Sequence, residues 1–213
     1  MCFHTEQTKL ALELETRFEA TLDNPLEFHP QNHINGFEFP QTPVIIDEKP
    51  QIITHYNWGL IPAWAKDAEI QKHTLNAKIE TVTEKPSFKN SVNKRCLVIA
   101  DGYFEWQWLD PKGKNKQKYE IGLPNQELFA FAGLYSQWVD KNTGEIKNTY
   151  TILTTEANPL MAEIHNTKKR MPVMLKREDE TKWLEHEPIQ NFAFPYDVNL
   201  VAKQIHPDKA TLW

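Results

Sequence analysis

The residue of this sequence with the most unusual chemistry is the cysteine at its second position. Removal of Met1 would leave Cys2 at the N-terminus, where its α-amine and its thiol form a 1,2-aminothiol. The amine has a pKa near ~7.7–8.0 and the thiol near ~8.5, so both are partly nucleophilic at neutral pH. The amine can condense with an aldehyde to a Schiff base, and the thiolate can then close on the same carbon to form a thiazolidine ring. The thiol alone can instead attack an acyl carbon, as in amidases with a catalytic N-terminus. Position alone also fits a cysteine without any catalytic role.

Three polar residues interrupt apolar stretches and are candidates for proton transfer or hydrogen bonding. Asn76 follows Leu75, and Glu105 lies in the aromatic run 100–106. A carboxylate among aromatic rings has its pKa raised by desolvation unless it is paired, which suits it to proton transfer; a strand edge facing solvent is the alternative. His165 precedes a basic run. A lone histidine is more often structural than catalytic, so its role stays open here.

The composition favours a protein without metal or cofactor. The other histidines show no paired ligand spacing, and two cysteines make neither a disulfide framework nor a cysteine-only zinc site. The chain has only 7 glycines, which disfavours glycine-rich phosphate loops. No apolar run approaches ~18 residues, and the first ten residues lack the apolar core of a signal peptide. The sequence therefore predicts a cytoplasmic protein with free thiols and no membrane contact.

The net charge of −5 argues on average against nucleic-acid binding, but the charge is unevenly distributed. Residues 1–50 hold 3 basic and 9 acidic side chains, so the acidic excess lies in the N-terminal part. Basic side chains gather in three later runs: Lys85, Lys89, Lys94 and Arg95; Lys112, Lys114, Lys116 and Lys118; and Lys168, Lys169, Arg170, Lys176 and Arg177. Each run fits either a solvated face or a surface for a polyanion.

The elements that must position these residues follow from the hydrophobic pattern. Leucine or phenylalanine every four residues predicts a helix over 8–21, and a proline-containing stretch over 23–43 reads as a loop. Strands are expected at 43–46, 52–58, 96–106, 117–121, 127–138, 149–155 and 198–202, with a hairpin turn at 140–144 and short helices at 159–164 and 177–185. We expect an α+β fold, with residues 1–213 forming a single compact domain around a curved antiparallel, barrel-like sheet.

Several segments, taken in order, resemble the SOS response-associated peptidase (SRAP) family. They are Met1-Cys2, the stretches 58–64 (WGLIPAW), 76–81 (NAKIET), 96–106 (CLVIADGYFEW) and 131–135 (FAGLY), and His165 with 170–175 (RMPVML). Together they span nearly the whole chain. The resemblance implies a function in DNA damage repair and the SOS response, namely processing of abasic sites in single-stranded DNA. It also implies an α+β fold with a basic channel for the DNA strand.

The resemblance further implies roles for individual residues. Cys2 would form a covalent thiazolidine link with the ring-opened aldehyde of an abasic sugar. Asn76 would hydrogen-bond the opened sugar, Glu105 would shuttle the proton for ring closure, and His165 would assist sugar opening, Schiff-base formation and reversal. The activity would be of cross-linking or lyase type, and the name "peptidase" refers to removal of Met1, by the protein itself or by an aminopeptidase.

The residues expected to contact DNA are those with a base-stacking ring or a positive charge near these motifs. Trp58, Trp64 and Trp106 are candidates for stacking, worth ~1–3 kcal/mol per base, although Trp58 fits the core equally well. The DNA contacts predicted from the family motifs and the basic runs are His4, Trp64, Lys78, Lys168, Lys169 and Arg170. The chain departs from the family pattern in four places. His4 and Lys78 stand where arginine is usual, and lysine lacks the two-point phosphate geometry of arginine. The spacing between His165 and Arg170 is longer, and the proline-rich region before Pro43 matches poorly.

Two other classes of function remain open at the level of sequence. A cysteine peptidase or amidase would use Cys2 with His165 as its base. A non-enzymatic module would bind intact single strands in a salt-sensitive way. The presence of Asn76, Glu105 and His165 together with Cys2 favours an enzyme, expected as a monomer, whose partner is single-stranded DNA containing abasic sites.

Overall fold

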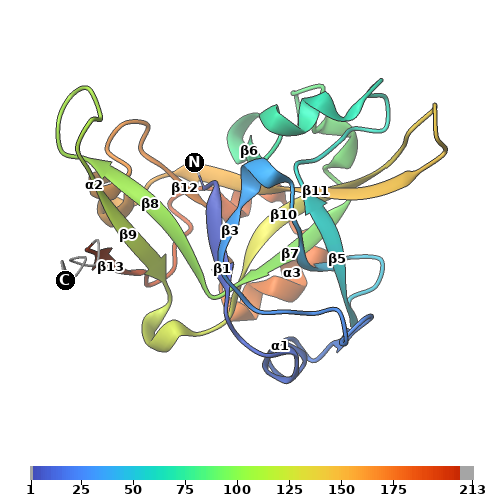
Figure 1. Ribbon diagram of the computed structural model, residues 1–213, viewed down its shortest axis with the longest axis horizontal. Coiled ribbons are helices and arrows are strands. Elements are labelled where there is room, and N and C mark those ends of the chain that lie inside the picture. The colour runs from blue at the N-terminus through green and yellow to red at the C-terminus, as the bar shows by residue number, and fades with distance from the viewer. Residues whose placement is uncertain (1, 207–213) are drawn as a thin grey trace, which may run out of the picture.

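Two curved β-sheets make up most of the computed structural model, which describes residues 2–206 (Figure 1). The larger sheet has the strand order β12-β11-β10-β7-β4-β5-β2, and β6 pairs with β11 beside this path. Its strands are β2 (Thr21–Leu22), β4 (Gln41–Ile46), β5 (Ile52–Trp58), β6 (Asn76–Lys78), β7 (Arg95–Ala100), β10 (Phe129–Val139), β11 (Ile146–Glu156) and β12 (Arg170–Pro172).

The larger sheet closes on itself. β11 pairs antiparallel with β10 and parallel with β5, where Tyr150 lies opposite Trp58, so β5, β4, β7, β10 and β11 form a barrel. β7 is buried along its whole length, because successive side chains point to opposite faces and both faces are covered. Leu97 and Ile99 belong to one apolar cluster, whereas Cys96 and Val98 belong to the other.

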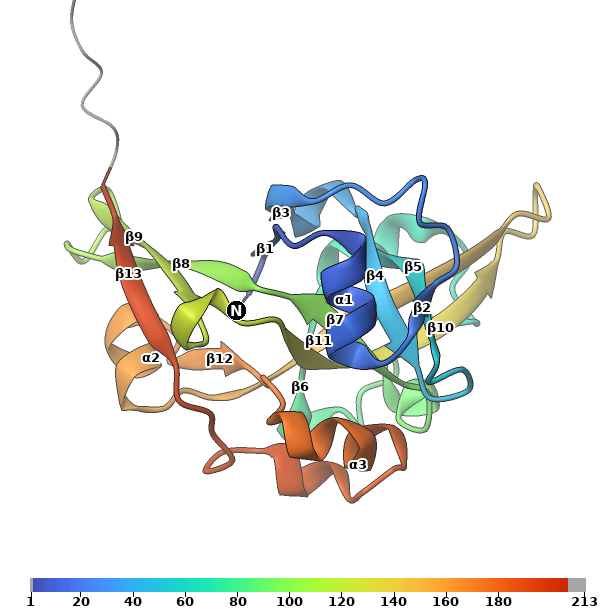
Figure 2. The same cartoon turned by 90° about the horizontal axis from the view of Figure 1, so that it is seen from below.

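The smaller sheet covers the second of these clusters. Its order is β13-β9-β8-β1-β3, with β1 (His4–Gln7), β3 (Gln31–Asn35), β8 (Gly102–Trp108), β9 (Lys116–Gly122) and β13 (Val201–Ile205). Figure 2 shows β13 beside β9 at the outer edge, away from the barrel. The chain passes from the barrel into this sheet between β7 and β8, at Asp101, whose carboxylate accepts hydrogen bonds from the amide and hydroxyl of Thr8. This crossing brings the N-terminal strand beside β8.

The helices are short and pack at the ends of the sheets. They are α1 (Ala11–Phe18), α2 (Pro159–Ile164) and α3 (Glu180–Leu184), with 3-10 turns η1 (Gly36–Glu38), η2 (Ala68–His73), η3 (Ile79–Thr81), η4 (Lys89–Ser91), η5 (Pro124–Gln126), η6 (Arg177–Asp179) and η7 (Ile189–Phe192). Asn158 caps α2 by accepting a hydrogen bond from the Met161 amide at 2.8 Å, and Pro159 occupies its first turn. This start signal places His165 at the end of α2.

The predicted α+β fold with a barrel-like core is confirmed, and several element boundaries were wrong. The expected strand 96–106 is two strands in two sheets. The helix expected over 8–21 is limited to Ala11–Phe18, because the segment before it is drawn into β1 and the Asp101 contact. The loop expected over 23–43 contains β3, η1 and the start of β4, and the last strand lies at Val201–Ile205 instead of 198–202. No helix among residues 2–206 is long and apolar enough to cross a membrane.

Candidate active site

Cys2 lies buried at the entry to β1, in the apolar cluster between the two sheets. The segment is held by the Gly36 amide, which donates to the Phe3 carbonyl at 2.8 Å. Burial raises the pKa of the Cys2 thiol, and the nearby charge of Glu105 raises it further. The thiol is therefore protonated at neutral pH, and its attack on an electrophile requires a base. Met1, whose removal is expected, lies outside the described residues.

Asn76 joins the barrel to the N-terminal segment. It begins β6, which pairs in parallel with β11, and its side-chain Nδ2 donates to the Cys2 carbonyl at 2.8 Å. The Oδ1 atom of the same amide is buried and accepts no hydrogen bond from the residues that the structure describes. A buried amide oxygen of this kind is costly unless a ligand hydroxyl or amine donates to it. The Nδ2 atom of Asn76 thus holds Cys2 in place, and its Oδ1 atom is able to accept a hydrogen bond from a ligand.

Glu105 is a buried carboxyl whose charge acts on the Cys2 thiol. It lies on β8 with 5% of its surface exposed, and burial raises its pKa to about 7. A carboxyl with this pKa both accepts and donates a proton near neutral pH. The fully buried Tyr103, two residues before it, has its pKa raised by burial and by the charges of Cys2 and Glu105, so all three groups are close neighbours. The hydroxyl of Tyr103 donates to the Met161 sulfur at 3.3 Å.

His165 reaches the same region from the end of α2. It is 8% exposed, and burial lowers its pKa to about 4, so the imidazole is neutral at pH 7. Its Nδ1 lies 2.8 Å from the Arg170 carbonyl oxygen. Donation from Nδ1–H to that carbonyl makes Nε2 the basic nitrogen of the ring.

Glu105 and His165 line one cleft of about 270 Å³, whereas Cys2 and Asn76 are not part of its lining. Its lining is Phe3, Glu105, Trp106, Trp108, Lys116, His165, Thr167 and Lys168. The sequence motifs singled out Glu105 and His165 but gave no role to Phe3, Tyr103 or Thr167. The alternation of β8 is the signal that could have indicated Tyr103, because residues two apart on a strand share a face.

The side chains predicted to contact DNA differ in their exposure and in the partners that they already have within the protein. Lys78, Lys168 and Lys169 are exposed, and Lys168 lines the cleft. Trp64 is 52% exposed and donates from its indole to the Pro86 carbonyl at 3.2 Å. Trp58 is fully buried, so the stacking role considered for it is wrong. Its indole donates to the Leu75 carbonyl at 2.8 Å and helps to place the neighbouring Asn76.

His4 stands where the family usually has arginine, and it does not replace the charge of that arginine. Burial lowers its pKa, and the neighbouring His33 and Lys118 lower it further, so the ring is neutral at pH 7. His4 stacks on His33 with ring centroids 5.0 Å apart and meets the edge of Trp106 at 4.9 Å. The residue is thus part of an aromatic cluster beside the cleft.

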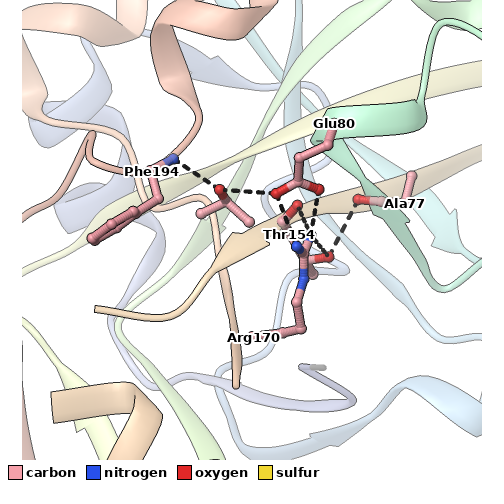
Figure 3. Close-up of polar contacts among 6 residues, drawn as sticks. Ala77, Glu80, Thr154, Arg170 and Phe194 are labelled. Carbon is pink, nitrogen blue, oxygen red and sulfur yellow. Dashed lines mark hydrogen bonds and ion pairs between the residues drawn. The ribbon is translucent and has the colours of Figure 1, made fainter. Parts of the chain in front are cut away.

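Arg170 is held by an ion pair within the protein (Figure 3). Its guanidinium donates to both carboxylate oxygens of Glu80 at 2.8 Å and to the Thr154 carbonyl at 2.6 Å. Glu80 also accepts a hydrogen bond from the Thr155 hydroxyl at 3.3 Å. This network joins β12 to the turn after β6. It fixes the position of the Arg170 carbonyl, which holds His165, and a DNA phosphate would have to share the guanidinium with Glu80.

The site is composed of nucleophile, acid–base and hydrogen-bonding groups. Among residues 2–206, no group of three or more histidine, cysteine, aspartate or glutamate side chains could hold a metal ion. The arrangement suits addition to a carbonyl group: a thiol, a carboxyl poised near pH 7, a neutral imidazole and an amide acceptor.

Comparison with known proteins identifies relatives along most of the chain. The family described as SOS response associated peptidase (SRAP) matches residues 1–208. The abasic site processing protein YoqW of Bacillus subtilis is 41% identical over 181 residues, which cover 81% of this chain and 77% of YoqW. The abasic site processing protein HMCES of Xenopus tropicalis is 33% identical over 162 residues, covering 65% of this chain and 47% of HMCES. A crystal structure of a Bacteroides thetaiotaomicron protein superposes with a TM-score of 0.86 at 37% identity, covering 97% of this chain and 93% of that one.

Proposed function

The chain belongs to the SRAP family, and on this premise we propose that it processes abasic sites in single-stranded DNA by forming a covalent link through Cys2. The proposal requires removal of Met1, so that the Cys2 amine is free to react. The observation that carries it is the hydrogen bond from Asn76 to the Cys2 carbonyl, 74 residues away in sequence, beside a carboxyl whose pKa is about 7. The names of the curated relatives support the same substrate.

The chemistry begins at the aldehyde that an abasic deoxyribose presents in its open form. The Cys2 amine adds to the aldehyde carbon, and loss of water from the resulting carbinolamine gives a Schiff base. The Cys2 sulfur then bonds to the same carbon, and the proton that leaves the thiol is balanced by the proton gained at nitrogen. Ring closure therefore needs no oxidant or further reactant, and the product is a thiazolidine.

The surrounding side chains have different roles in these reaction steps. Glu105 accepts the thiol proton and returns a proton to nitrogen, which a carboxyl with a pKa near 7 does in both directions. The neutral His165 accepts a proton from the sugar hydroxyl during ring opening and returns it when the link is reversed. The buried Oδ1 of Asn76 accepts a hydrogen bond from the opened sugar. Lys78, Lys168, Lys169 and Arg170 attract the phosphates, and Trp64 and His4 contact bases as rings.

An abasic oligonucleotide tests the proposal directly. Purified protein without Met1, verified by mass, is mixed with a single strand containing one abasic site and analysed on a denaturing gel after heating. We expect a heat-stable adduct from the wild type and from Cys96→Ala, which alters the other buried cysteine. Cys2→Ala removes the adduct. Cys2→Ser keeps the amine without the thiol, so its Schiff base is captured only after borohydride reduction.

The same experiment separates the other classes of function. A folded wild-type protein that lacks Met1 and forms no adduct contradicts the proposal. An acyl-enzyme formed from small esters without any DNA adduct would indicate an amidase, and DNA binding that survives Cys2→Ser with no adduct in the wild type would indicate a binding module. Because one chain supplies every residue of the site, we propose that the protein acts as a monomer, in the cytoplasm where its DNA substrate lies.

A further inference from the structure

The cleft at Glu105 and His165 continues into a second hollow of about 480 Å³, which we call the hairpin groove. Its lining residues are Trp108, Leu109, Asp110, Pro111, Asn166 and Thr167. Trp108 and Thr167 line both spaces, so the hairpin groove is an extension of the cleft. Figure 1 shows its two walls as neighbouring loops, the green loop of the β8–β9 hairpin and the orange loop that follows α2.

Hydrogen bonds hold these two walls together. The side chain of Asn166 donates from Nδ2 to the Trp108 carbonyl at 2.8 Å and accepts at Oδ1 from the Trp108 amide at 3.1 Å. One residue earlier, the Gln107 side chain donates to the Glu163 carbonyl at 3.2 Å. These hydrogen bonds attach the loop after α2 to the end of β8, because a side chain of each segment bonds to backbone groups of the other. A wall fixed in this way needs little ordering when a ligand binds.

The hairpin itself is also shaped before any ligand arrives. The Asp110 carboxylate accepts hydrogen bonds from the amides of Lys112, at 2.9 Å, and of Asn115, which closes the turn. Gly113 has a φ of +62° and lies directly over the indole of Trp108, because a Cβ at this position would come within 2.7 Å of the ring. The turn therefore fixes the orientation of Trp108 and uses the one carboxylate that lines the hairpin groove.

The chemistry of the hairpin groove combines an apolar lining with a cationic rim. Leu109 is 62% exposed, and Trp108 and Pro111 extend the same apolar surface. By the cationic rim we mean the exposed lysines on the two segments that supply the walls: Lys112, Lys114 and Lys116 on the hairpin, and Lys168 and Lys169 after α2. An unpaired nucleotide matches both features, because its base has an apolar face and its phosphate is anionic. In a duplex the base faces are covered by stacking, so a duplex does not fit this lining.

We propose that the hairpin groove binds the unpaired nucleotide that neighbours the abasic site on the same DNA strand. This inference rests on the proposed function, since it takes the abasic sugar to lie in the adjoining cleft. It assigns the hairpin groove to substrate selection: a strand in which that neighbour is single-stranded is captured faster than one in which it is missing or paired.

Leu109→Asp is the variant that tests this assignment, because it places a negative charge in the lining at an exposed position. Val139→Asp is its matched control, as Val139 is a 47% exposed residue at the end of a strand that leads into the other hairpin, β10–β11. Three oligonucleotides of equal length carry the abasic nucleotide at the centre, at the 5′ end or at the 3′ end. The initial rate of adduct formation is measured below saturation for each protein and each strand.

We expect Leu109→Asp to slow capture of the central abasic site about tenfold, which corresponds to the lower part of the range for losing one stacked base. One of the two end-positioned sites lacks the neighbour that the hairpin groove takes, and on that strand the wild type and Leu109→Asp react at equal rates. Lys112→Gln combined with Lys114→Gln gives the same strand dependence with a smaller effect and flattens the salt dependence. Val139→Asp resembles the wild type on every strand.

Three results would overturn the inference. Equal rates for Leu109→Asp and the wild type on the central site would show that the hairpin groove is not used. Equal slowing on all three strands would show that the variant disturbs the cleft and not the binding of a neighbouring nucleotide. Unchanged rates when a complementary strand pairs the neighbour would contradict the selection for an unpaired base. Failure of the proposed function looks different, because the wild type then forms no adduct with any strand.

Discussion

Replacing Glu105 with glutamine should stabilise the protein at alkaline pH while slowing its chemistry. Burial raises the pKa of Glu105 from its ordinary value of 4.5 to about 7. Between these two values the folded protein binds the proton and the unfolded chain has released it, so the stability conferred by this group falls as the pH rises. Linkage gives a cost to stability of about 3 kcal/mol at pH 8, where the folded carboxyl is ionised. At pH 5 the folded carboxyl is protonated while the unfolded one is mostly ionised, and the cost is about 1 kcal/mol.

Glutamine has nearly the shape of the protonated glutamate and is neutral at every pH. The free energy of unfolding of Glu105→Gln, relative to the wild type, should therefore rise by about 2 kcal/mol more at pH 8 than at pH 5. Denaturation by guanidinium chloride at the two pH values measures this difference. Glu84→Gln, at an exposed position, serves as the control and should show the same small change at both pH values.

The refuting result is a Glu105→Gln difference that does not depend on pH. It would mean that Glu105 is solvated when charged, and the argument for its proton transfer near pH 7 would fail with it. The adduct assay provides the second half of the prediction. Wild-type rates should change between pH 6 and 8 as Glu105 titrates, and the variant should be slower and show a flatter profile over this range.

Three further predictions concern the groups around Cys2. Asn76→Ala removes the hydrogen bond to the Cys2 carbonyl, so it should cost about 1 kcal/mol of stability and slow adduct formation at least tenfold, as measured by denaturation and gel assay. His165→Gln should reduce the loss of stability in acid: burial lowers the histidine pKa from 6.5 to about 4, so the wild type loses stability as the pH falls through this window, and melting temperatures at pH 7 and 5 measure the change. Glu80→Gln weakens the two-point ion pair with Arg170, so it should lower stability by about 1 kcal/mol and slow adduct formation by displacing the carbonyl that holds His165.

Each of these predictions has a result that would contradict it. Normal adduct rates for Asn76→Ala would show that the hydrogen bond to Cys2 is not needed for the reaction. If His165→Gln loses as much stability as the wild type between pH 7 and 5, the imidazole is exposed to solvent in the folded protein. For Glu80→Gln the matched control is Glu69→Gln, which breaks the exposed pair with Lys72 and should leave stability unchanged. Equal effects of these two variants would mean that the Arg170 pair contributes no more than a surface contact.

Sequence patterns correctly predicted those helices and strands whose start, end and periodicity depend only on neighbouring residues. The strand at Ile52–Trp58 and the helix at Pro159–Ile164 were confirmed to the residue, because the first alternates apolar side chains between turns and the second has an asparagine cap followed by proline. The run from Cys96 to Trp106 looked like one strand because both of its halves are apolar. The Asp101-Gly102 pair inside the run is a local breaker signal that was not used, and the contact that holds the division is with Thr8, 93 residues away.

Sequence motifs could name candidate site residues but could not give their geometry. Motif resemblance selected Cys2, Asn76, Glu105 and His165, while β6 and β12 were missed because three-residue strands carry no periodic signal. The lowered pKa of His4 comes from burial and from His33 and Lys118, and these neighbours lie on other strands. The ion pair of Arg170 was equally hidden from local patterns, because its partner Glu80 lies 90 residues earlier in the chain.

The parallel pairing of β5 with β11 has a consequence for how the protein is made. The barrel cannot close until Tyr150 is available to Trp58, and the Cys2 carbonyl is held only once Asn76 has been placed by β6 against β11. Contacts between such distant residues form late, because the intervening chain must first lose its freedom. During synthesis the N-terminal end therefore stays accessible for most of the time that the ribosome needs to translate the chain. On the proposed function, this is the interval in which Met1 would be removed, before folding buries Cys2.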